Sequence, residues 1–180
     1  MAQKNNWQQY KDIIERNNIK CLYHFTDREN LESIINNGGL YSWADCKAKG
    51  IDIPKPGGSA QSRQLDTRDN LQNYVRVSFV TQHPMMYVAM NEGRISNPVI
   101  LKIDPKVIWQ EDTKYADRNA TKNGAKVGGE LSDFERIHFN AVKAIKHFDL
   151  PEEEQMFFQA EVLVKNFIPL EYITNIANFG

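Results

Sequence analysis

The stretch QMFFQAEVLV, residues 155–164, combines aromatic and β-branched residues in a way that is typical of a β-strand. Glu161 does not fit this pattern, because glutamate is depleted in strands and an ionised carboxylate is costly inside a packed sheet. Alternation divides the side chains into an apolar face, Phe158, Ala160, Val162 and Val164, and a mixed face, Gln159, Glu161 and Leu163. The mixed face suits either solvent, with Glu161 exposed on an edge strand, or the wall of a ligand cleft.

Composition describes an ordinary globular chain. Its 180 residues suffice for a single domain, expected to span 1–180, and hydrophobic and charged contents of 41% and 25% are typical of such domains. There is no apolar run of membrane-spanning length and no secretory signal, so a cytoplasmic protein without membrane contact is expected. The net charge of -1 argues against indiscriminate binding of polyanions but permits a local basic groove.

The residue types that bind metals or phosphates show none of the usual spacings. The two cysteines, Cys21 and Cys46, form no CxxC pattern, and no two histidines have the spacing of ligands on one helix face. No GxxxxGK loop occurs, and serine, threonine and cysteine lack a local nucleophile signature. A bound metal is therefore not expected.

Hydrophobic periodicity predicts an α+β domain with at least four or five strands. Strands are expected at 21–25, 74–80, 98–104 and 156–165, with 98–104 the strongest candidate for a buried strand. Helices are expected at 6–17, after a capping box of Thr26 and Glu29, after Pro84, and after a cap of Ser132 with Glu135. The last helix is expected to turn five residues toward the core: Phe134, Ile137, Ala141, Ile145 and Phe148.

Two long segments, 41–70 and 111–130, are predicted to be irregular. The first contains prolines and glycines without a sustained period, and the second is strongly polar. Loops of this length in a compact domain are usually either functional or disordered.

His24 lies in YHFT, 23–26, at a strand end directly before a helix start. Such an end collects polar donors and commonly binds anions or ligand edges, although a purely structural role is the alternative for a lone histidine. His83 is interpreted as a cap or turn residue, and His138 and His147 as surface or packing residues.

Three segments together resemble one known family. YHFTDRENLESIINNGGL (23–40) is similar to the opening of the DarT family of DNA ADP-ribosyltransferases, the toxin half of DarTG toxin–antitoxin pairs. NYVRVSFVTQHPMMY (73–87) is similar to the family's central segment, and QAEVLV (159–164) to the strand with its catalytic glutamate. The segments occur in the family's order, and the resemblance covers most of the chain from 21 to 175.

The resemblance implies an ADP-ribosyltransferase-like fold, in which two small packed β-sheets with flanking helices surround a cleft for NAD. NAD would serve as substrate, with no metal, and Glu161 would project into the cleft. Cleavage of the bond between nicotinamide and ribose develops oxocarbenium character, which a carboxylate hydrogen-bonded to the neighbouring 2′-hydroxyl stabilises.

The resemblance also implies a set of site residues. Glu161 and Arg63 would be catalytic, with Arg68 as a substitute for the loop arginine; a guanidinium stays protonated, so it would anchor phosphate or orient the acceptor rather than act as a base. NAD would contact His24, Thr26, Asn30, Ser33, Tyr74, Ser78 and Tyr87, with Tyr74 or Tyr87 stacked on nicotinamide. Nucleic acid would contact Arg76, His83, Met85, Lys114, Tyr115, Lys122 and Lys126, and the alternative for 111–130 is merely a soluble flexible loop.

The expected partners follow from the family. The substrate would be single-stranded DNA, and a cognate antitoxin, of macrodomain type or similar, would remove the ADP-ribose from it; a monomer is expected. Arg76 and Ser78 stand where some relatives carry other residues, often a second aromatic, so thymine and guanine both remain open as the modified base. An RNA or protein acceptor, or a non-catalytic nucleic-acid-binding domain, are the competing interpretations.

Overall fold

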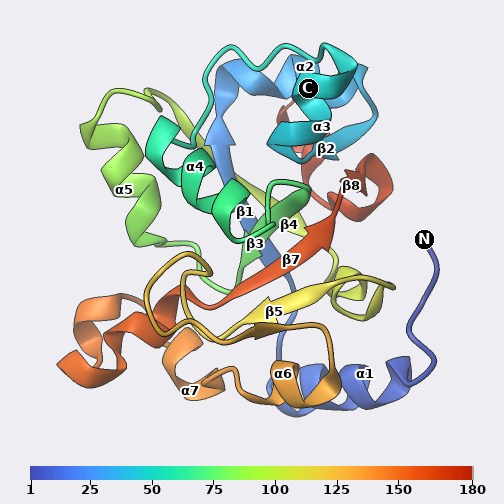
Figure 1. The fold of residues 1–180 in the computed structure, drawn as a ribbon, viewed down its shortest axis with the longest axis vertical. Helices are drawn as coiled ribbons and strands as arrows, with labels where there is room; N and C mark the ends of the chain where they lie inside the picture. The colour runs from blue at the N-terminus through green and yellow to red at the C-terminus, as the bar shows by residue number, and fades with distance from the viewer. Residues whose placement is uncertain (180) are drawn as a thin grey trace.

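The computed structural model describes residues 1–179 and has the expected α+β class (Figure 1). A six-stranded antiparallel sheet has the order β4-β1-β3-β7-β5-β6, and β2 pairs with β8 in a second, two-stranded sheet. The strands are β1 Leu22–Asp27, β2 Gly39–Tyr41, β3 Tyr74–Ser78, β4 Pro98–Ile103, β5 Lys114–Ala116, β6 Val127–Gly128, β7 Glu161–Lys165 and β8 Phe167–Pro169.

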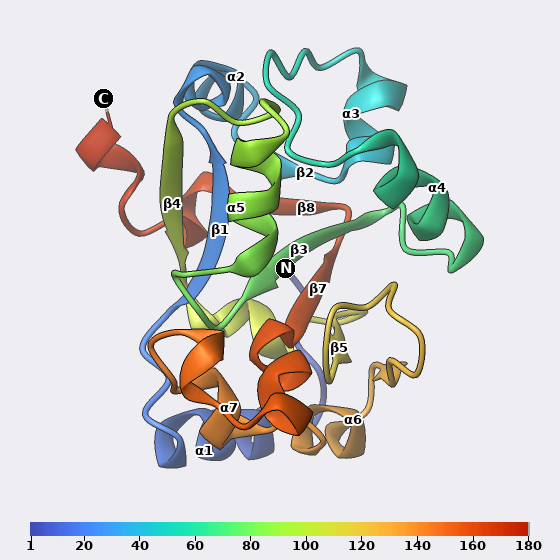
Figure 2. The same ribbon diagram turned by 90° about the vertical axis from the view of Figure 1, so that its left-hand side faces the viewer.

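Short helices cover the two ends of the large sheet. Helices α1, α6 and α7 lie at one end, and α2, α3 and α4 at the other (Figures 1 and 2). The helices are α1 Trp7–Arg16, α2 Leu31–Asn36, α3 Trp43–Lys49, α4 Ala60–Arg68, α5 Pro84–Asn91, α6 Leu131–Glu135 and α7 Phe139–Val142. No helix within residues 1–179 combines the length and the apolar character needed to cross a bilayer.

The large sheet divides into two halves between β1 and β3. Strand β1 pairs with β4 along its whole length, and β3 pairs with β7 along its whole length. Between β1 and β3, however, only Tyr23 and Ser78 are in register. The two halves diverge from this point (Figure 2), so the sheet is one splayed ladder that opens a space between its halves.

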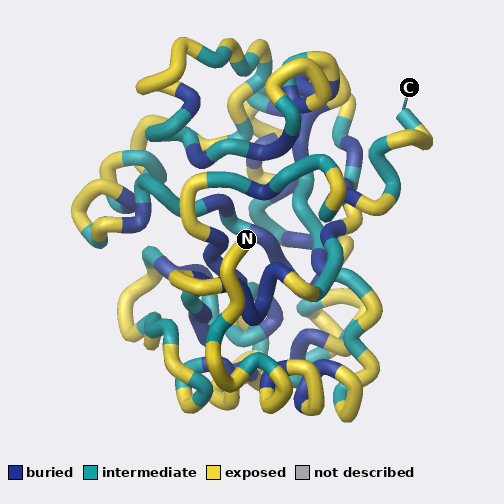
Figure 3. Tube along the Cα trace, turned by 90° about the vertical axis from the view of Figure 1, so that its right-hand side faces the viewer, coloured by how far each residue is buried: buried dark blue, intermediate teal, exposed yellow. Residues whose placement is uncertain are grey.

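The core gathers along the central strands, whereas exposed residues lie on the peripheral helices and loops (Figure 3). Helix α1 buries Tyr10, Ile13 and Ile14 on one face, as its sequence period predicts. Tyr10 meets Tyr115 and Phe134 with ring centroids 5.5–5.6 Å away, so α1, β5 and α6 share one aromatic cluster.

Strand β7 is an interior strand, which overturns the solvent explanation for Glu161. It lies between β3 and β5, and Glu161 is only 5% exposed. Conversely, 98–104 was expected to be a buried strand, but β4 is an edge strand and exposes Lys102. Its apolar run reflects packing on one face only.

Segment 41–70 is not irregular throughout, because it contains α3 and α4. Ser42 caps α3 by accepting a hydrogen bond from the Asp45 N–H, and Gly50 ends it with a φ of 67°. Ser59 caps α4 in the same way. Helix α4 has no apolar stripe, and its one buried residue is Asp66, which explains why periodicity does not reveal it.

Three further expectations are corrected. The helical turn Arg28–Asn30, which precedes α2, is capped by Asp27, which accepts the Glu29 N–H at 3.0 Å, whereas Thr26 lies within strand β1. The helix expected after Ser132 breaks into α6 and α7, and Ile145 and Phe148 are each 75% exposed. Segment 111–130 contains β5 and β6.

Tyr115 was expected to contact nucleic acid but lies fully buried in the core. Its hydroxyl donates to the Ile108 carbonyl, and its ring centroid lies 4.9 Å from that of Phe134. A ring enclosed in this way cannot stack on a base.

We expect Tyr115→Ala to lower the free energy of unfolding by about 3–5 kcal/mol, because the ring fills core space. Chemical denaturation measures the loss. Lys126→Ala, at an exposed site in the same segment, is the control and should change stability by less than about 0.5 kcal/mol. Equally small losses from both variants would contradict a core position for Tyr115.

His83 caps α5, as its sequence context predicts. Its Nδ1 accepts the Met85 N–H at 3.1 Å, which assigns the proton of the neutral ring to Nε2. Burial lowers the pKa of His83 from 6.5 to about 4, and the nearby positive charge of Arg76 acts in the same direction. Between these values the unfolded chain binds more protons than the folded one, so stability rises with pH and is lost as the pH falls.

His83→Asn, which keeps a capping acceptor without the titration, should therefore lose less stability than the wild type between pH 6.5 and pH 4. As the pH falls across this window, the free energy of unfolding of the variant should gain up to about 3 kcal/mol relative to that of the wild type. Urea denaturation at a series of pH values measures it. A difference that does not vary with pH would show that His83 does not titrate in this way.

Candidate active site

A cavity of about 450 Å³ occupies the space between the two halves of the sheet. Strands β1 and β3 border it on two sides, α3 and α4 close a third, and Glu161 borders it from the start of β7. This volume lies in the range of small-molecule sites. The cavity therefore exists because β1 and β3 separate after a single register pair.

Glu161 occupies a gap between two small neighbours. In the register of the sheet it stands opposite Ser78 on β3 and Ala116 on β5, which leave room around its carboxylate. Its Oε2 accepts the Ala120 N–H at 2.8 Å and lies 3.4 Å from Arg76 Nη1. Within residues 1–179 no protein donor contacts Oε1, so one oxygen remains for a ligand.

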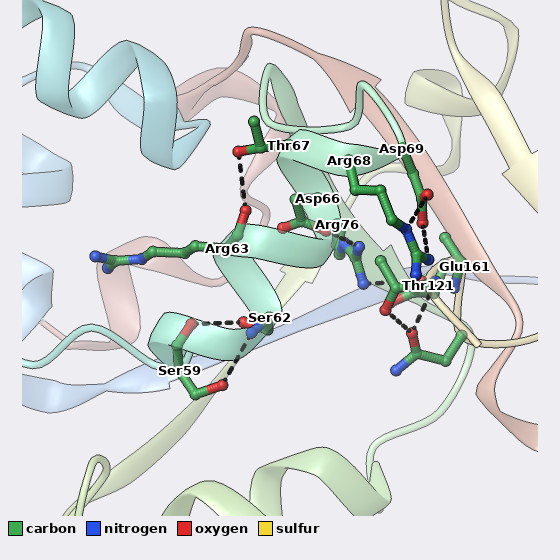
Figure 4. Close-up of polar contacts among 12 residues, drawn as sticks. Ser59, Ser62, Arg63, Asp66, Thr67, Arg68, Asp69, Arg76, Thr121 and Glu161 are labelled. Atoms are coloured by element: carbon green, nitrogen blue, oxygen red, sulfur yellow. Dashed lines mark hydrogen bonds and ion pairs between the residues drawn. The ribbon is translucent and has the colours of Figure 1, made fainter. Parts of the chain in front are cut away.

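Arg76 joins two buried carboxylates. Its guanidinium pairs with Glu161 through Nη1 and with Asp66 through Nη2 (Figure 4). Burial would lower the pKa of Arg76, but Glu161 and Asp66 outweigh it and the pKa is raised. Burial raises the pKa of Asp66, and Arg76 only partly opposes this. Arg76 was expected to contact nucleic acid, but its guanidinium is committed to these carboxylates.

His24 bridges the two halves of the sheet where the backbone ladder is missing. Its Nδ1 lies 2.9 Å from the Arg76 carbonyl oxygen, which can only accept, so Nδ1 carries the proton. Burial lowers the pKa of His24 more than this hydrogen bond raises it, so the ring is neutral and Nε2 has a free lone pair. His24 thus combines the structural role with an acceptor at the cavity wall.

Two residues that were expected to contact NAD, Asn30 and Ser33, use their side chains to hold a loop in place. The Asn30 side-chain amide donates to Thr26 Oγ1 at 2.9 Å and to the Lys55 carbonyl at 2.7 Å, and it accepts the Lys55 N–H at 2.8 Å. Ser33 Oγ donates to the Asp52 carbonyl at 2.6 Å. These bonds fix the segment before α4 beside the cavity.

The sheet and its flanking segments bring most of the expected site residues to one place. Those that line the cavity are Glu161, Arg63, His24, Thr26, Asn30, Ser33, Tyr74, Ser78, Arg76, His83, Met85 and Lys122. Five others do not line it: Tyr87, Lys114, Tyr115, Lys126 and Arg68. Tyr87 is 43% exposed and donates its hydroxyl to Gln82.

The loop arginines differ in their surroundings. Arg63 borders the cavity, but its side chain points away from Glu161 (Figure 4), and its guanidinium lies 5.7 Å from the ring centroid of Trp43. Arg68 is exposed and paired with Asp69 at 2.7 Å. A catalytic role for either arginine stays a prediction.

The loop between β5 and β6, residues 117–126, folds over the carboxylate of Glu161. Asp117 pairs with Arg118 at 3.1 Å and accepts the Lys126 N–H at 3.0 Å, which closes the loop at its base. Asn119 Oδ1 accepts the N–H and the hydroxyl of Thr121 at 3.2 and 3.0 Å. This bonding orders the turn that aims the Ala120 N–H at Glu161, and it disagrees with a merely flexible loop.

Sequence reasoning missed Asp66 and Trp43. Asp66 lies in a polar helix, and its partner Arg76 is on another element, so no local pattern marks it. Trp43 follows a recognisable Ser-x-x-Asp cap signal, which would have identified α3 and its place beside the cavity. No group of three His, Cys, Asp or Glu side chains able to hold a metal occurs in the part of the chain that the structure describes.

Several solved structures share this fold. DarT from Thermus sp. 2.9 in complex with ADP-ribosylated ssDNA matches with a TM-score of 0.70 and 20% identity, over 87% of this chain and 79% of that chain. DarT from the same organism in complex with NAD+ has a TM-score of 0.62 and 21% identity, over 86% and 79%. Thermosipho africanus DarTG in complex with ADP-ribose has a TM-score of 0.67 and 21% identity, over 86% of this chain and 42% of that one.

The sequence comparison reaches the same family. No curated protein matches the chain. The family model described as "ssDNA thymidine ADP-ribosyltransferase, DarT" matches residues 23–179, which is most of the chain. The chain therefore belongs to the DarT family of ssDNA thymidine ADP-ribosyltransferases.

Proposed function

We propose that this chain transfers ADP-ribose from NAD+ to thymidine in single-stranded DNA, with Glu161 as its catalytic carboxylate. The family description names this activity, and related structures hold NAD+ or ADP-ribosylated ssDNA. The observation that carries the proposal is a buried carboxylate at the cavity, held by Arg76 and the Ala120 N–H with one oxygen free.

The cavity lining fits a dinucleotide substrate. Arg63, Arg94 and Lys122 border it and can pair with a diphosphate, while Tyr74 offers an aromatic surface. The Lys114 ammonium lies 5.1 Å from the centroid of the Tyr74 ring, so it leaves at most one face of that ring for a planar ligand.

Glu161 would act on the ribose. When bound, NAD+ supplies an activated bond between ribose and a positively charged leaving group. The free Oε1 of Glu161 accepts a hydrogen bond from the ribose 2′-hydroxyl and stabilises the positive charge that develops as this bond breaks. Arg76 and the Ala120 N–H hold the other oxygen, so the carboxylate does not need to reorient during the reaction.

Thymidine as the acceptor accounts for a preference for unpaired DNA. In DNA the N1 of thymine is bonded to deoxyribose, so N3 is the nitrogen left to react, and pairing in a duplex engages it. Enzymes that act on bases therefore use single strands or extrude the base. The family description favours thymidine over guanine.

The wider setting belongs to the proposal as well. We propose that 1–180 acts as one catalytic domain, as a monomer in the cytoplasm, and that an antitoxin with a macrodomain or a similar domain reverses its modification. The name DarTG of a structurally similar chain, of which this one covers 42%, supports a partner of this kind.

Glu161→Gln should reduce transfer at least about 100-fold, because the amide is isosteric but cannot stabilise a positive charge. Transfer is measured with labelled NAD+ and single-stranded oligonucleotides with or without thymidine. Glu171→Gln, which alters an exposed glutamate outside the cavity, is the matched control and should retain wild-type activity. RNA, duplex DNA and protein are parallel acceptors.

Equal activity of the Glu161 variant and the wild type would remove Glu161 from catalysis. Faster transfer to RNA, protein or duplex DNA than to single-stranded thymidine would replace the proposed acceptor by the one that reacts.

Lys122→Gln should weaken binding of single-stranded DNA and reduce its salt dependence by about one unit of slope, as for one lost phosphate contact. Lys122 is exposed and borders the cavity, whereas Lys126 of the same loop does not border it. Fluorescence anisotropy at several salt concentrations measures the slope, with Lys102→Gln on the edge strand β4 as control. An unchanged slope for Lys122→Gln would place the DNA backbone elsewhere.

A further inference from the structure

The buried ion cluster contains one carboxylate more than charge balance requires. Arg76 supplies one positive charge, whereas Glu161 and Asp66 supply two negative charges when both are ionised. Asp66 is 7% exposed and Glu161 is 5% exposed, so neither is well solvated. A pair of Arg76 with Glu161 would already be neutral, and an additional buried carboxylate is costly. Asp66 therefore needs an explanation beyond the neutralisation of Arg76.

Helix α4 presents Asp66 to the cavity with only part of its hydrogen-bonding capacity used. Oδ1 accepts from Arg76, and no protein donor within residues 1–179 makes a hydrogen bond of normal geometry to Oδ2. The Trp43 N–H is buried without such a bond, although it lies close enough to lower the pKa of Asp66 slightly. Since both residues line the cavity, Asp66 brings to the wall beside Glu161 a carboxylate whose hydrogen-bonding capacity is not fully used.

Arg76 also fixes how far Asp66 lies from the reacting centre. One guanidinium contacts both carboxylates, with Nη1 on Glu161 and Nη2 on Asp66, so the two acids are separated by only the width of that group. An acceptor base brought to the ribose beside Glu161 comes within reach of Asp66.

We propose that Asp66 is the catalytic residue that accepts the proton lost by the acceptor base. The inference rests on the proposed function, in which the acceptor is thymidine. Thymine N3 carries a hydrogen and is a poor nucleophile while it does, so transfer to this atom requires a proton acceptor.

The step balances as follows. The N3–H bond breaks and its proton moves to Asp66 Oδ2. The electron pair left on N3 forms the bond to ribose C1′, while the electron pair of the bond between C1′ and the nicotinamide nitrogen goes to nicotinamide, which leaves neutral. Asp66 then releases its proton to water. No oxidant or reductant is needed.

The surroundings of Glu161 and Asp66 differ, and this difference gives the two acids separate roles. Oε2 of Glu161 is held by two donors, and Oε1 is assigned to the ribose. Three groups face Asp66: Arg76 on β3, Glu161 on β7 and the Trp43 N–H on α3. Burial is the main cause of the raised pKa of Asp66. The negative charge of Glu161 raises this pKa further, whereas the positive charge of Arg76 lowers it. A raised pKa improves a carboxylate as a proton acceptor near neutral pH.

Asp66→Asn tests the assignment, because the amide oxygen still accepts from Arg76 while the basic oxygen is lost. Transfer from NAD+ to a thymidine oligonucleotide at pH 7 should fall about 100-fold or more. Asp52→Asn, the same change at an exposed site near the cavity, should leave transfer unchanged. Thermal denaturation and NAD+ titration confirm that the variant is folded and binds substrate.

The acidity of the acceptor separates proton transfer from positioning. Oligonucleotides carrying 5-fluorouracil or uracil differ in N3–H acidity, because fluorine withdraws electrons, and both lack the methyl group. The 5-fluorouracil to uracil rate ratio should be much larger for Asp66→Asn than for the wild type. The variant's rate should also rise with pH, about tenfold per unit, as N3 ionises without help.

A loss of transfer that is equal for both acceptors would overturn the proposal and make Asp66 a positioning residue for Arg76. Full activity of Asp66→Asn would overturn it as well. These results differ from failure of the proposed function, in which the wild type itself does not modify thymidine. If Asp66→Asn does not fold, Asp66→Glu supplies the same comparison, since a displaced carboxylate should keep part of the rate and a low acceptor ratio.

Discussion

The guanidinium of Arg76, buried between Asp66 and Glu161, is the interaction on which the arrangement of the site depends. It ties α4 to β3 and β7, and it sets the separation of the two acids that border the cavity. Without that positive charge, two carboxylates would lie together in a poorly solvated place, and breaking a buried ion pair of this kind typically costs several kcal/mol. The position of α4, a helix without an apolar stripe, thus rests on charge more than on hydrophobic burial.

The divergence of β1 and β3 is the second constraint, because a sheet that opens must satisfy the backbone groups exposed along the opening. The Arg76 carbonyl receives the His24 Nδ1–H instead of a strand partner. His83, which also lines the cavity, is kept neutral by burial and by the charge of Arg76. The backbone carbonyl of Arg76 thus accepts the hydrogen bond that links β1 to β3 across the gap. The side-chain charge of Arg76 lowers the pKa of the neighbouring His83.

The parts of the fold that sequence predicts are those with a local hydrophobic period. Strands β1 and β3 and helix α1 have such periods and occur close to their expected ranges. Strand β7 was expected at 156–165 but begins only at Glu161, because Glu152–Gln159 form a 3₁₀ helix. Helix α4 and strand β5 do not, because one is polar and the other has only three residues. Tyr115 shows what local composition cannot decide. An aromatic residue among lysines is compatible with a DNA-binding loop, but it is equally compatible with a short strand that buries the aromatic ring in the core, as Tyr115 does.

The site was predictable to the same extent and for the same reason. Glu161 is an anomaly within a strand, so the sequence itself draws attention to it. Asp66 has no such signal, because it acquires its environment from Arg76, 10 residues away, and through it from Glu161, 85 residues further on. Chemistry that arises from contact between distant segments can be recognised only after the chain is folded.

The two oxygens of Glu161 connect the cofactor side of the cavity to the acceptor side. Oε2 holds the Ala120 N–H, and Ala120 belongs to the turn that carries Lys122 to the cavity rim. Oε1 is the oxygen that the proposed mechanism gives to the ribose. Because the two tasks use different oxygens, a bound ribose does not displace the turn. The same carboxylate can therefore hold the acceptor-side loop in place and stabilise the reacting centre at the same time.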